Sequence, residues 1–358
     1  MILKTYQKFI KKIDKNKKIA ILGSDYIALE FAKQIELSRD DLKITFLITH
    51  NPNPNITDYK IHHPHELKLL QDNFDLIIVA DYSYITRLKI LFKLLEINNY
   101  IIPSPKMYLD AFLEKVSNTS KLLATNKDKK LYKLLAKARV TKDHSKVKSS
   151  GYSGHYLDFI NKDIITTAFD IGAYDAYNSL VFKANFKNCN QIYSFEPIYE
   201  ECKNDLLVPF IEEDNKIKII KKAIWNKSGK SNFKEIPNER YKSGLVDVSS
   251  MKSHLERVQS LETISIDEFI EQEKIKKLDF VKMDIENAEL AAIEGGLSSI
   301  IKHRPQLAIS IYHSGEQYTD ILIKLNESLT DYVYKIGHYD NKSVSETVLY
   351  AIPKEKLK

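Results

Sequence analysis

The feature that most constrains the fold is a series of short apolar segments in the C-terminal half of the chain. The segments predicted to be strands are Ile164–Asp170, Gln191–Glu196, Lys216–Lys221, Leu278–Asp284, Gln306–Tyr312, Tyr332–Ile336 and Thr347–Ile352. Helical patterns separate the first five, which predicts a parallel sheet covered by helices. Only a short polar stretch separates the last two, which predicts an antiparallel pair. The sequence therefore predicts an α/β sheet of seven strands with an antiparallel last pair.

The length of the chain suggests two domains, because a typical domain has about 150 residues and this chain has 358. Residues 1–105 contain fewer strands alternating with helices, which predicts a smaller N-terminal Rossmann-like α/β domain. Residues 106–162 have apolar side chains at helical spacing and no strand pattern, so we expect a helical connector there. Residues 163–358 are expected to form the larger domain. The N-terminal strands are expected at Lys18–Gly23, Ile44–Ile48 and Leu76–Ala80.

The composition argues against several classes of protein. The net charge of +6 is small and spread along the chain, so no basic stripe indicates nucleic-acid binding. Cys189 and Cys202 give neither a metal-binding spacing nor a disulfide framework, which favours a reducing compartment. No apolar stretch approaches the length of about 18 residues that a transmembrane helix needs. We therefore expect a cytoplasmic protein.

The first predicted strand of the larger domain ends in a turn that a ligand can approach. Asp170 closes the strand, and Gly172 permits a tight turn that a side chain would obstruct. Ala173 and Tyr174 continue the turn. Because ligands of open parallel sheets bind at the carboxyl ends of the strands, these four residues are predicted to bind a cofactor.

Two acidic strand ends complete the pattern. Glu196 lies 24 residues after Gly172 and precedes Pro197. This spacing is close to the interval of about 20 residues at which an acidic side chain meets a nucleotide ribose. The fourth strand brings Asp284 and Glu286 to the same edge of the sheet. The sequence therefore predicts a ligand with a ribose beside this edge.

A dinucleotide fits this pattern poorly. Tyr174 and Tyr177 stand where glycines would let a pyrophosphate approach the backbone, and Asp170 would repel the phosphates. S-adenosylmethionine (SAM) has no phosphate and carries a sulfonium cation, so acidic residues are compatible with it. The three motifs together predict a SAM site.

The chain from Ile164 to Pro353 resembles the FkbM methyltransferases. The resemblance rests on Phe169–Asp175, Phe195–Pro197, Lys282–Glu289, Arg304-Pro305, His313 and Ser345–Ala351. It implies a class I, Rossmann-like methyltransferase sheet and SAM-dependent O-methylation, often of sugars or natural products. It also implies that Ala223 lies beside the adenine of the cofactor.

The sequence departs from the family pattern at two positions where the family usually has glycine. Ala176 fits only if φ stays negative there, because alanine is strained in left-handed geometry. Asn287 is among the few residues other than glycine that adopt this geometry easily. We expect both residues to be accommodated.

A hydroxyl acceptor needs a base or a metal ion to remove its proton. The predicted catalytic residues are Asp284, Glu286 and His313, which follow strands at the cofactor edge, and His338 is a further candidate. An Asp/Glu pair also suits Mg²⁺, so a metal ion is left open. The run from His62 to His65 has no acidic partners at a clear spacing, and we do not predict a metal site there.

The predicted function is SAM-dependent O-methylation of a sugar hydroxyl on a glycan, a nucleotide-sugar or a related metabolite. The acceptor is thus expected to be a small molecule or a glycan, and a homodimer is left open. One alternative is a nucleic-acid methyltransferase, which the basic loop from Lys142 to Lys148 keeps open. No Asn-Pro-Pro-Tyr type motif follows the fourth strand to support it. The other alternative is a protein that keeps the fold but only binds a partner.

Overall fold

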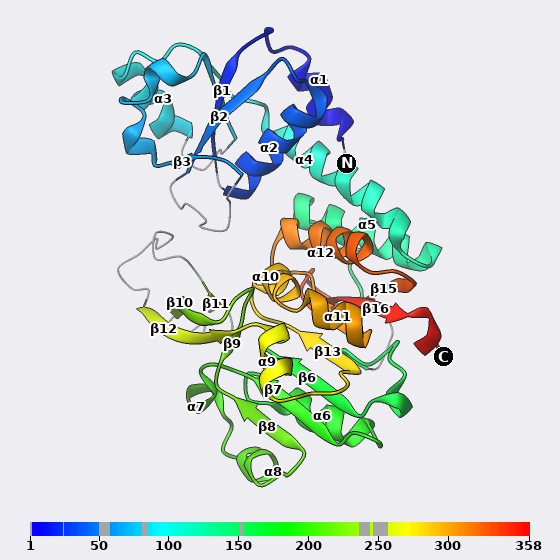
Figure 1. Ribbon diagram of the computed structural model, residues 1–358. Coiled ribbons are helices and arrows are strands. Elements are labelled where there is room, and N and C mark those ends of the chain that lie inside the picture. The colour runs from blue at the N-terminus through cyan, green and yellow to red at the C-terminus, as the bar shows by residue number, and fades with distance from the viewer. Residues whose placement is uncertain are drawn as a thin grey trace. The chain divides into compact units, whose positions relative to one another are not determined.

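The computed structural model describes residues 2–23, 25–49, 58–80, 85–150, 154–235, 244–245 and 257–358. Contacts among these residues divide the chain into two units, one ending at Lys115 and the other beginning at Val116. Figure 1 labels the elements of each unit.

The first unit contains a five-stranded parallel sheet with the strand order β3-β2-β1-β4-β5. Side chains of β1 alternate between its faces: Ile19 and Ile21 join one core, and Ala20 and Leu22 join the other. Both faces of the sheet are covered, as a parallel sheet requires. The elements are α1 (Lys4–Ile10), β1 (Lys18–Leu22), α2 (Asp25–Ser38), β2 (Lys43–Ile48), β3 (Ile61–His62), β4 (Leu76–Val79), α3 (Ile85–Leu94), β5 (Tyr100–Ile101) and α4 (Pro105–Thr119), which begins in this unit.

The three strands predicted in this unit correspond to β1, β2 and β4. The short strand β3 and the helix α1 were not predicted, because two residues are too few for a pattern and lysines interrupt the apolar residues of α1. The strand order follows that of doubly wound sheets. The assignment of this unit as a Rossmann-like domain stays a prediction.

The second unit contains a seven-stranded sheet with the order β15-β16-β14-β13-β6-β7-β8. β16 is antiparallel to both of its neighbours, β14 and β15, and the other neighbouring strands are parallel. The predicted seven strands and antiparallel last pair are confirmed, with small differences at strand ends. The strands are β6 (Thr167–Ile171), β7 (Gln191–Phe195), β8 (Ile217–Ile220), β13 (Phe280–Met283), β14 (Gln306–Ser310), β15 (Tyr332–His338) and β16 (Thr347–Pro353).

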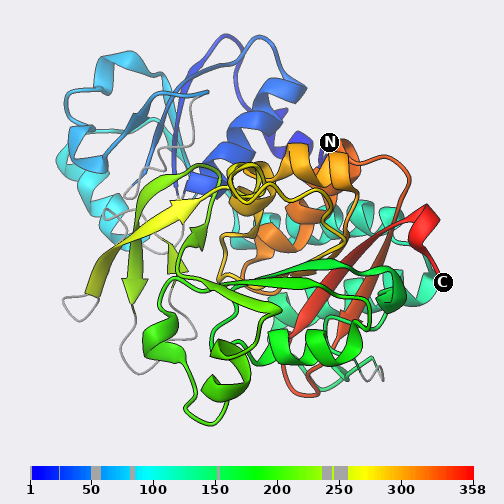
Figure 2. The same cartoon turned by 60° about the horizontal axis from the view of Figure 1, so that its bottom comes forward.

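Helices cover both faces of this sheet (Figure 2). On one face, Phe182 and Phe186 pack edge-on against Phe280 of β13. On the other face, Phe269 packs edge-on against Phe169 and Phe195 of the sheet. The helices of this unit are α5 (Asn126–Thr141), α6 (Tyr177–Asn185), α7 (Tyr199–Cys202), α8 (Val208–Glu212), α9 (Ile266–Gln272), α10 (Glu289–Glu294), α11 (Leu297–His303) and α12 (Gly315–Ser328).

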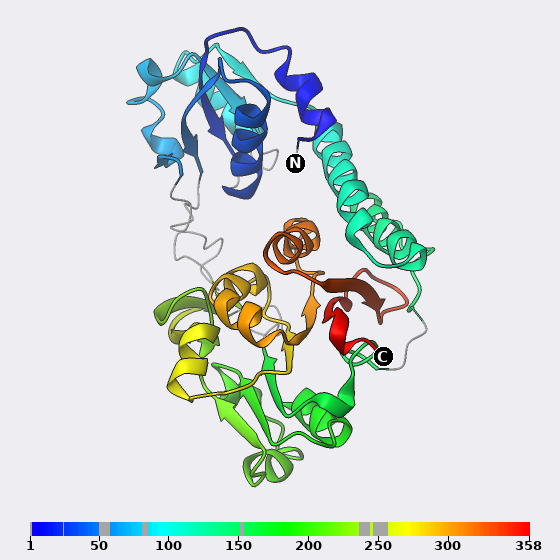
Figure 3. The same ribbon diagram turned by 45° about the vertical axis from the view of Figure 1, so that its right-hand side comes forward.

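Helix α5 lies beside α12, which Figure 3 shows from a second side. Tyr132 of α5 stacks on Tyr318 of α12 with ring centroids 4.4 Å apart. Each of the two hydroxyl groups donates to the other residue's carbonyl oxygen. Asp128 of α5 also accepts a hydrogen bond from the backbone N–H of Ile336 in β15. The segment before the sheet is therefore tied to its β15 edge.

The connection between β8 and β13 differs from the predicted helical crossover. It contains a second sheet of order β11-β10-β12-β9, and α9 follows this sheet. Its longest strands are polar and pair antiparallel, so apolar alternation does not reveal them in the sequence. The strands are β9 (Ala223–Ile224), β10 (Gly229–Glu235), β11 (Gly244–Leu245) and β12 (Arg257–Ile264). Among the described residues, no helix is both long and apolar enough to cross a membrane.

Candidate active site

The turn after β6 lies against the carboxyl ends of its neighbouring strands. Gly172 has a φ of +76°, and a Cβ at this position would lie 1.8 Å from the carbonyl oxygen of Asp284. The backbone N–H groups of Gly172 and Ala173 both donate to the carbonyl oxygen of Phe195, each at 3.0 Å. The turn therefore depends on the absence of a side chain, as the sequence predicted for Gly172.

A buried ion pair supports this turn. Lys282 Nζ lies 3.0 Å from Asp170 Oδ1 and donates to the carbonyl oxygen of Gly172 at 2.5 Å. Ser179 of α6 donates to the other carboxylate oxygen of Asp170 at 2.7 Å. The sequence predicts that Asp170 binds the cofactor, but Asp170 has no exposed surface, so its side chain is not available to a bound molecule. Its carboxylate pairs with Lys282, for which the sequence analysis predicts no role although Lys282 lies in the motif Lys282–Glu289.

Glu196 lies directly after β7, with its carboxylate facing the turn. One oxygen accepts the N–H of Tyr174 at 3.0 Å, and the other accepts the N–H of Ile198 at 3.2 Å. Burial raises the pKa of Glu196 to about 7, although these two backbone hydrogen bonds oppose the shift. Pro197 follows in a turn and is partly buried. Each carboxylate oxygen keeps a lone pair free for a ligand hydroxyl.

Two other predicted cofactor residues have different surroundings. Ala223 is buried in β9, where it pairs with Thr263 of β12. Tyr174 is about half exposed and has a φ of 52°. Tyr174 therefore offers an open aromatic ring at the turn, whereas Ala223 offers a methyl group and its backbone.

Ala176 differs from the prediction that its φ would be negative. It has a φ of 59°, is fully buried and precedes the first residue of α6. Its N–H donates to the carbonyl oxygen of Ala173 at 2.7 Å, so the chain turns left-handed here in order to start the helix. This geometry costs an alanine about 1–2 kcal/mol.

Replacement of Ala176 by glycine is therefore expected to raise the free energy of unfolding of the second unit by about 0.5–1 kcal/mol. The fluorescence of Trp225, the only tryptophan of the chain, reports this unfolding in a urea titration. The control is Ala136→Gly in the interior of α5, which we expect to lower the same quantity by about 1 kcal/mol or more. A loss of stability in Ala176→Gly as large as that of the control would contradict the left-handed geometry.

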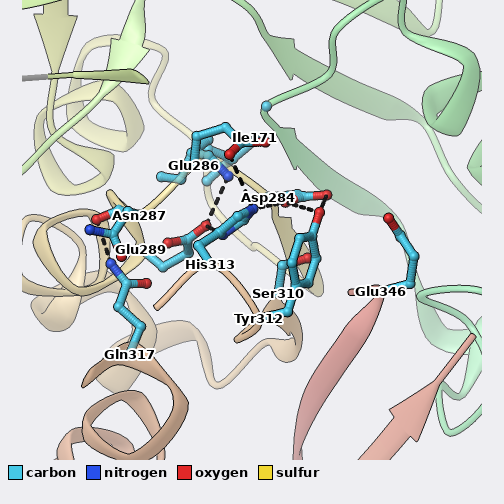
Figure 4. Close-up of polar contacts among 12 residues, drawn as sticks. Ile171, Asp284, Glu286, Asn287, Glu289, Ser310, Tyr312, His313, Gln317 and Glu346 are labelled. Atoms are coloured by element: carbon cyan, nitrogen blue, oxygen red, sulfur yellow. Dashed lines mark hydrogen bonds and ion pairs between the residues drawn. The ribbon is translucent and has the colours of Figure 1, made fainter. Parts of the chain in front are cut away.

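Asp284 and His313 follow the adjacent strands β13 and β14, and their side chains meet (Figure 4). His313 Nε2 lies 3.2 Å from Asp284 Oδ1 and 3.6 Å from Glu286 Oε2. The structure thus brings together the three residues that the sequence predicted to be catalytic. The parallel pairing of β13 and β14 causes this, because it places both carboxyl ends at one edge.

Glu289 completes the cluster from the first turn of α10. Its Oε1 lies 3.0 Å from His313 Nδ1 and accepts the N–H of Ile285 at 2.9 Å. Burial opposes a charge on His313, but the ion pairs with Asp284, Glu286 and Glu289 prevail and raise its pKa to about 12. The sequence predicts no catalytic role for Glu289, because an acidic residue at a helix start is favoured by the helix dipole alone.

The hydroxyl groups of two tyrosines contact the carboxylate of Asp284. Tyr156 donates to its Oδ2 at 2.7 Å, and Tyr312 lies 3.3 Å from its Oδ1. Burial alone would raise the pKa of Asp284, but the ion pair with His313 and the charge of Lys282 lower it to about 2. Tyr156 comes from a segment without a strand pattern or a motif, so its contact with Asp284 could not be predicted from the sequence.

Two predicted residues remain, Asn287 and His338. Asn287 has a φ of 81°, the left-handed geometry that we predicted for it. Its carbonyl oxygen accepts a hydrogen bond from Gln317 of α12 (Figure 4). His338 lies fully buried in β15 with its Nδ1 3.0 Å from Thr347 Oγ1, and burial lowers its pKa. Its side chain faces the core and offers no surface to a substrate.

Comparisons with known proteins agree with this geometry. Residues 170–336 match the family model described as the methyltransferase FkbM domain. Among solved structures, the methyltransferase FkbM from Methylobacillus flagellatus aligns with a TM-score of 0.51 and 15% identity, covering 98% of this chain and 94% of that chain. A protein from Clostridium thermocellum, provisionally described as an rRNA methylase, aligns with a TM-score of 0.33 and 10% identity, covering 60% of this chain and 94% of that chain. That score is too low to support an argument about fold.

No curated protein sequence matches the chain significantly. The likeness to the Methylobacillus protein shows the fold, and the family model matches the part of the sequence that contains the Gly172 turn, Asp284 and His313. Together with the strand order and the glycine turn, they show that this chain carries a methyltransferase FkbM domain over residues 170–336.

Proposed function

We propose that this methyltransferase uses SAM as its methyl donor and that a sugar hydroxyl on a glycan, a nucleotide-sugar or a related metabolite is the acceptor. The observation that carries the proposal is the meeting of Asp284, Glu286 and His313 beside the Gly172 turn. Polar groups of this kind suit an acceptor that must lose a proton.

The residues of the turn fit SAM. The side-chain-free backbone at Gly172 allows close approach, and the carboxylate of Glu196 has lone pairs for the two ribose hydroxyls. We propose that SAM is held by Gly172, Ala173, Tyr174, Glu196, Pro197, Ala223 and Asp284. When bound, SAM supplies a methyl group on a cationic sulfur.

The cluster has the groups that the acceptor requires. Methyl transfer to a hydroxyl oxygen releases the hydroxyl proton, and a group within hydrogen-bond reach must take it up. Asp284 and Glu286 are the proposed acceptors of this proton, whereas His313, whose raised pKa keeps it protonated, is proposed to position the acceptor hydroxyl. Holding the hydroxyl oxygen in line with the methyl group supplies much of the remaining acceleration.

The aromatic and polar side chains beside Asp284 favour an acceptor with several hydroxyl groups. Tyr312 and Tyr156 present phenol groups to Asp284, and His155 Nε2 lies 3.3 Å from Glu346 Oε2. The ring of His155 stacks on that of Tyr156. Several donors and acceptors next to aromatic rings are suited to a sugar, which presents hydroxyl groups together with apolar C–H faces.

Calorimetric titration with SAM and with its demethylated product tests the cofactor. We expect micromolar binding by the full chain and a loss of at least tenfold in Glu196→Ala, equivalent to about 1.4 kcal/mol or more. The control is Glu200→Ala, an exposed carboxylate in the helix that follows. No measurable binding by the folded protein would overturn the proposal and favour a protein that only binds a partner.

The affinity for SAM is expected to rise with pH. The pKa of Glu196 is raised to about 7, so a carboxyl group that is mostly protonated at pH 6 must ionise before it can accept both ribose hydroxyls. Binding at pH 6 should be about tenfold weaker than at pH 8, since each pH unit below the pKa removes about 1.4 kcal/mol. The variant Glu196→Gln should bind weakly at both values. A wild type whose affinity is the same at both pH values would contradict this assignment.

The same shift affects stability with the opposite sign. Because the folded-state pKa of Glu196 lies above its ordinary value of 4.5, its contribution to stability is complete below pH 4.5 and is lost as the pH rises through about 7. Cofactor-free protein is thus expected to lose this contribution at the pH values where SAM binds best.

A nucleic-acid acceptor is the second candidate. The segment after α5 carries Lys142, Lys146 and Lys148. RNA or DNA binding that weakens steeply with added salt would favour this acceptor over a sugar.

A further inference from the structure

The cluster around His313 has the geometry of a metal site. One ligand atom each from Asp284, Glu289 and His313 can be chosen so that all three lie within 4.8 Å of one another. A metal ion with bonds of about 2.1 Å places opposite ligands about 4.2 Å apart. A small closure of these side chains would therefore bring all three into contact with one ion.

Two of the three side chains are buried and have polar atoms without hydrogen bonds. Glu289 is 0% exposed, and its Oε2 has no hydrogen-bond partner among the described residues. The side chain of His313 is 6% exposed, and its two nitrogens contact carboxylates at ion-pair distance without hydrogen-bond geometry. Buried polar atoms normally have partners, so Glu289 Oε2, which has none among the described residues, indicates a ligand that binds beside it.

Hydrogen bonds from neighbouring residues orient the carboxylate oxygens of Asp284 and Glu289. Tyr156 donates to Asp284 Oδ2, and Oδ1 is the oxygen nearer to His313. The N–H of Ile285 donates to Glu289 Oε1, which leaves Oε2 as the oxygen without a partner. Metal-binding carboxylates are commonly fixed by such outer hydrogen bonds.

We propose that Asp284, Glu289 and His313 bind a divalent first-row transition-metal ion. The nearby Glu286 adds a third carboxylate, so negative charge exceeds what one imidazole can balance. A ligand set of imidazole and carboxylate suits manganese, iron or zinc, whereas Mg²⁺ prefers oxygen ligands alone. Such an ion would polarise an acceptor hydroxyl bound beside it. The metal site itself does not require that the protein transfers a methyl group.

Manganese is the probe, because free aqueous Mn²⁺ has a strong electron paramagnetic resonance signal that is lost on binding. The full chain is treated with chelator, dialysed without SAM and titrated with Mn²⁺. We expect one saturable site, and a spin-echo experiment should show coupling of the bound Mn²⁺ to an imidazole nitrogen. Glu289→Gln and His313→Gln should each weaken binding at least tenfold, and His313→Gln should remove the nitrogen coupling.

The control is Glu294→Gln, which alters an exposed carboxylate at the end of the same helix and should leave binding unchanged. Circular dichroism shows whether each variant is folded. Absence of saturable binding in the folded wild type would overturn the inference and leave the proton on His313 as the cation of the cluster. Equal binding by the two cluster variants and the wild type would overturn it too. If SAM binds while Mn²⁺ does not, only this inference fails.

Discussion

Replacement of Gly172 by alanine is expected to abolish SAM binding and to lower the free energy of unfolding of the second unit by about 2–5 kcal/mol. The φ of +76° is strained for alanine, and the new Cβ would lie 1.8 Å from the carbonyl oxygen of Asp284. Backbone cannot move aside as a flexible side chain can. The turn would have to withdraw from β13, and Ala173 and Tyr174, which we propose to contact SAM, would move with it. Urea denaturation followed by Trp225 fluorescence, together with calorimetric titration of SAM, measures both effects.

Gly229→Ala provides the control. Gly229 also has a positive φ, of +141°, but a Cβ there has nothing within 4 Å. The control therefore carries backbone strain without the collision, and we expect a smaller loss of stability with SAM binding retained. If the two variants lose the same stability and both bind SAM, the close approach of Gly172 to Asp284 is not what shapes the site.

Replacement of Lys282 by methionine is expected to lower the free energy of unfolding by about 3–5 kcal/mol, the usual cost of removing one partner of a buried ion pair. Lys282 is 1% exposed and Asp170 is 0% exposed, so the remaining carboxylate could not be reached by water. The same change removes the hydrogen bond from Lys282 to the Gly172 carbonyl oxygen. We therefore also expect weaker SAM binding, measured by the same titration.

The double variant Asp170→Asn/Lys282→Met separates these effects. It has no buried charge at this position, so most of the lost stability should return. The support for the Gly172 carbonyl oxygen is still missing, so SAM binding should stay weaker than in the wild type. A double variant as unstable as Lys282→Met alone would show that the ion pair is not the source of the loss.

The candidate site includes residues that lie outside the matched range 170–336, both before and after it. Tyr156, which lies outside the matched residues 170–336, donates to Asp284, and Glu346 lies beyond them on the other side. Arg139 of α5 donates to the carbonyl oxygen of Tyr312, next to His313. The segment before the sheet thus helps to position the residues around His313 in addition to packing against the sheet.

The sequence by itself determined where the seven strands lie along the chain and the sheet edge at which Asp284, Glu286 and His313 gather. Period-two and helical patterns are local, and the carboxyl ends of parallel strands meet at one edge whatever the details of packing. The meeting of Asp284, Glu286 and His313 followed from this rule alone. Gly172 could be recognised as a turn residue because few residues other than glycine allow a tight turn directly after a buried strand.

The tertiary structure decided the features that depend on partners distant in sequence. In the sequence, Asp170 ends a strand just as a cofactor-binding residue would. Only the structure shows that it is buried against Lys282 and supports the turn through that ion pair. Glu289 at the start of α10 has an ordinary local explanation until His313 is placed 3.0 Å from it. The polar strands β10 and β12 gain their stability from pairing with each other, so neither has a signal of its own. Ala176 is left-handed because the turn and α6 together require it, against the preference of alanine.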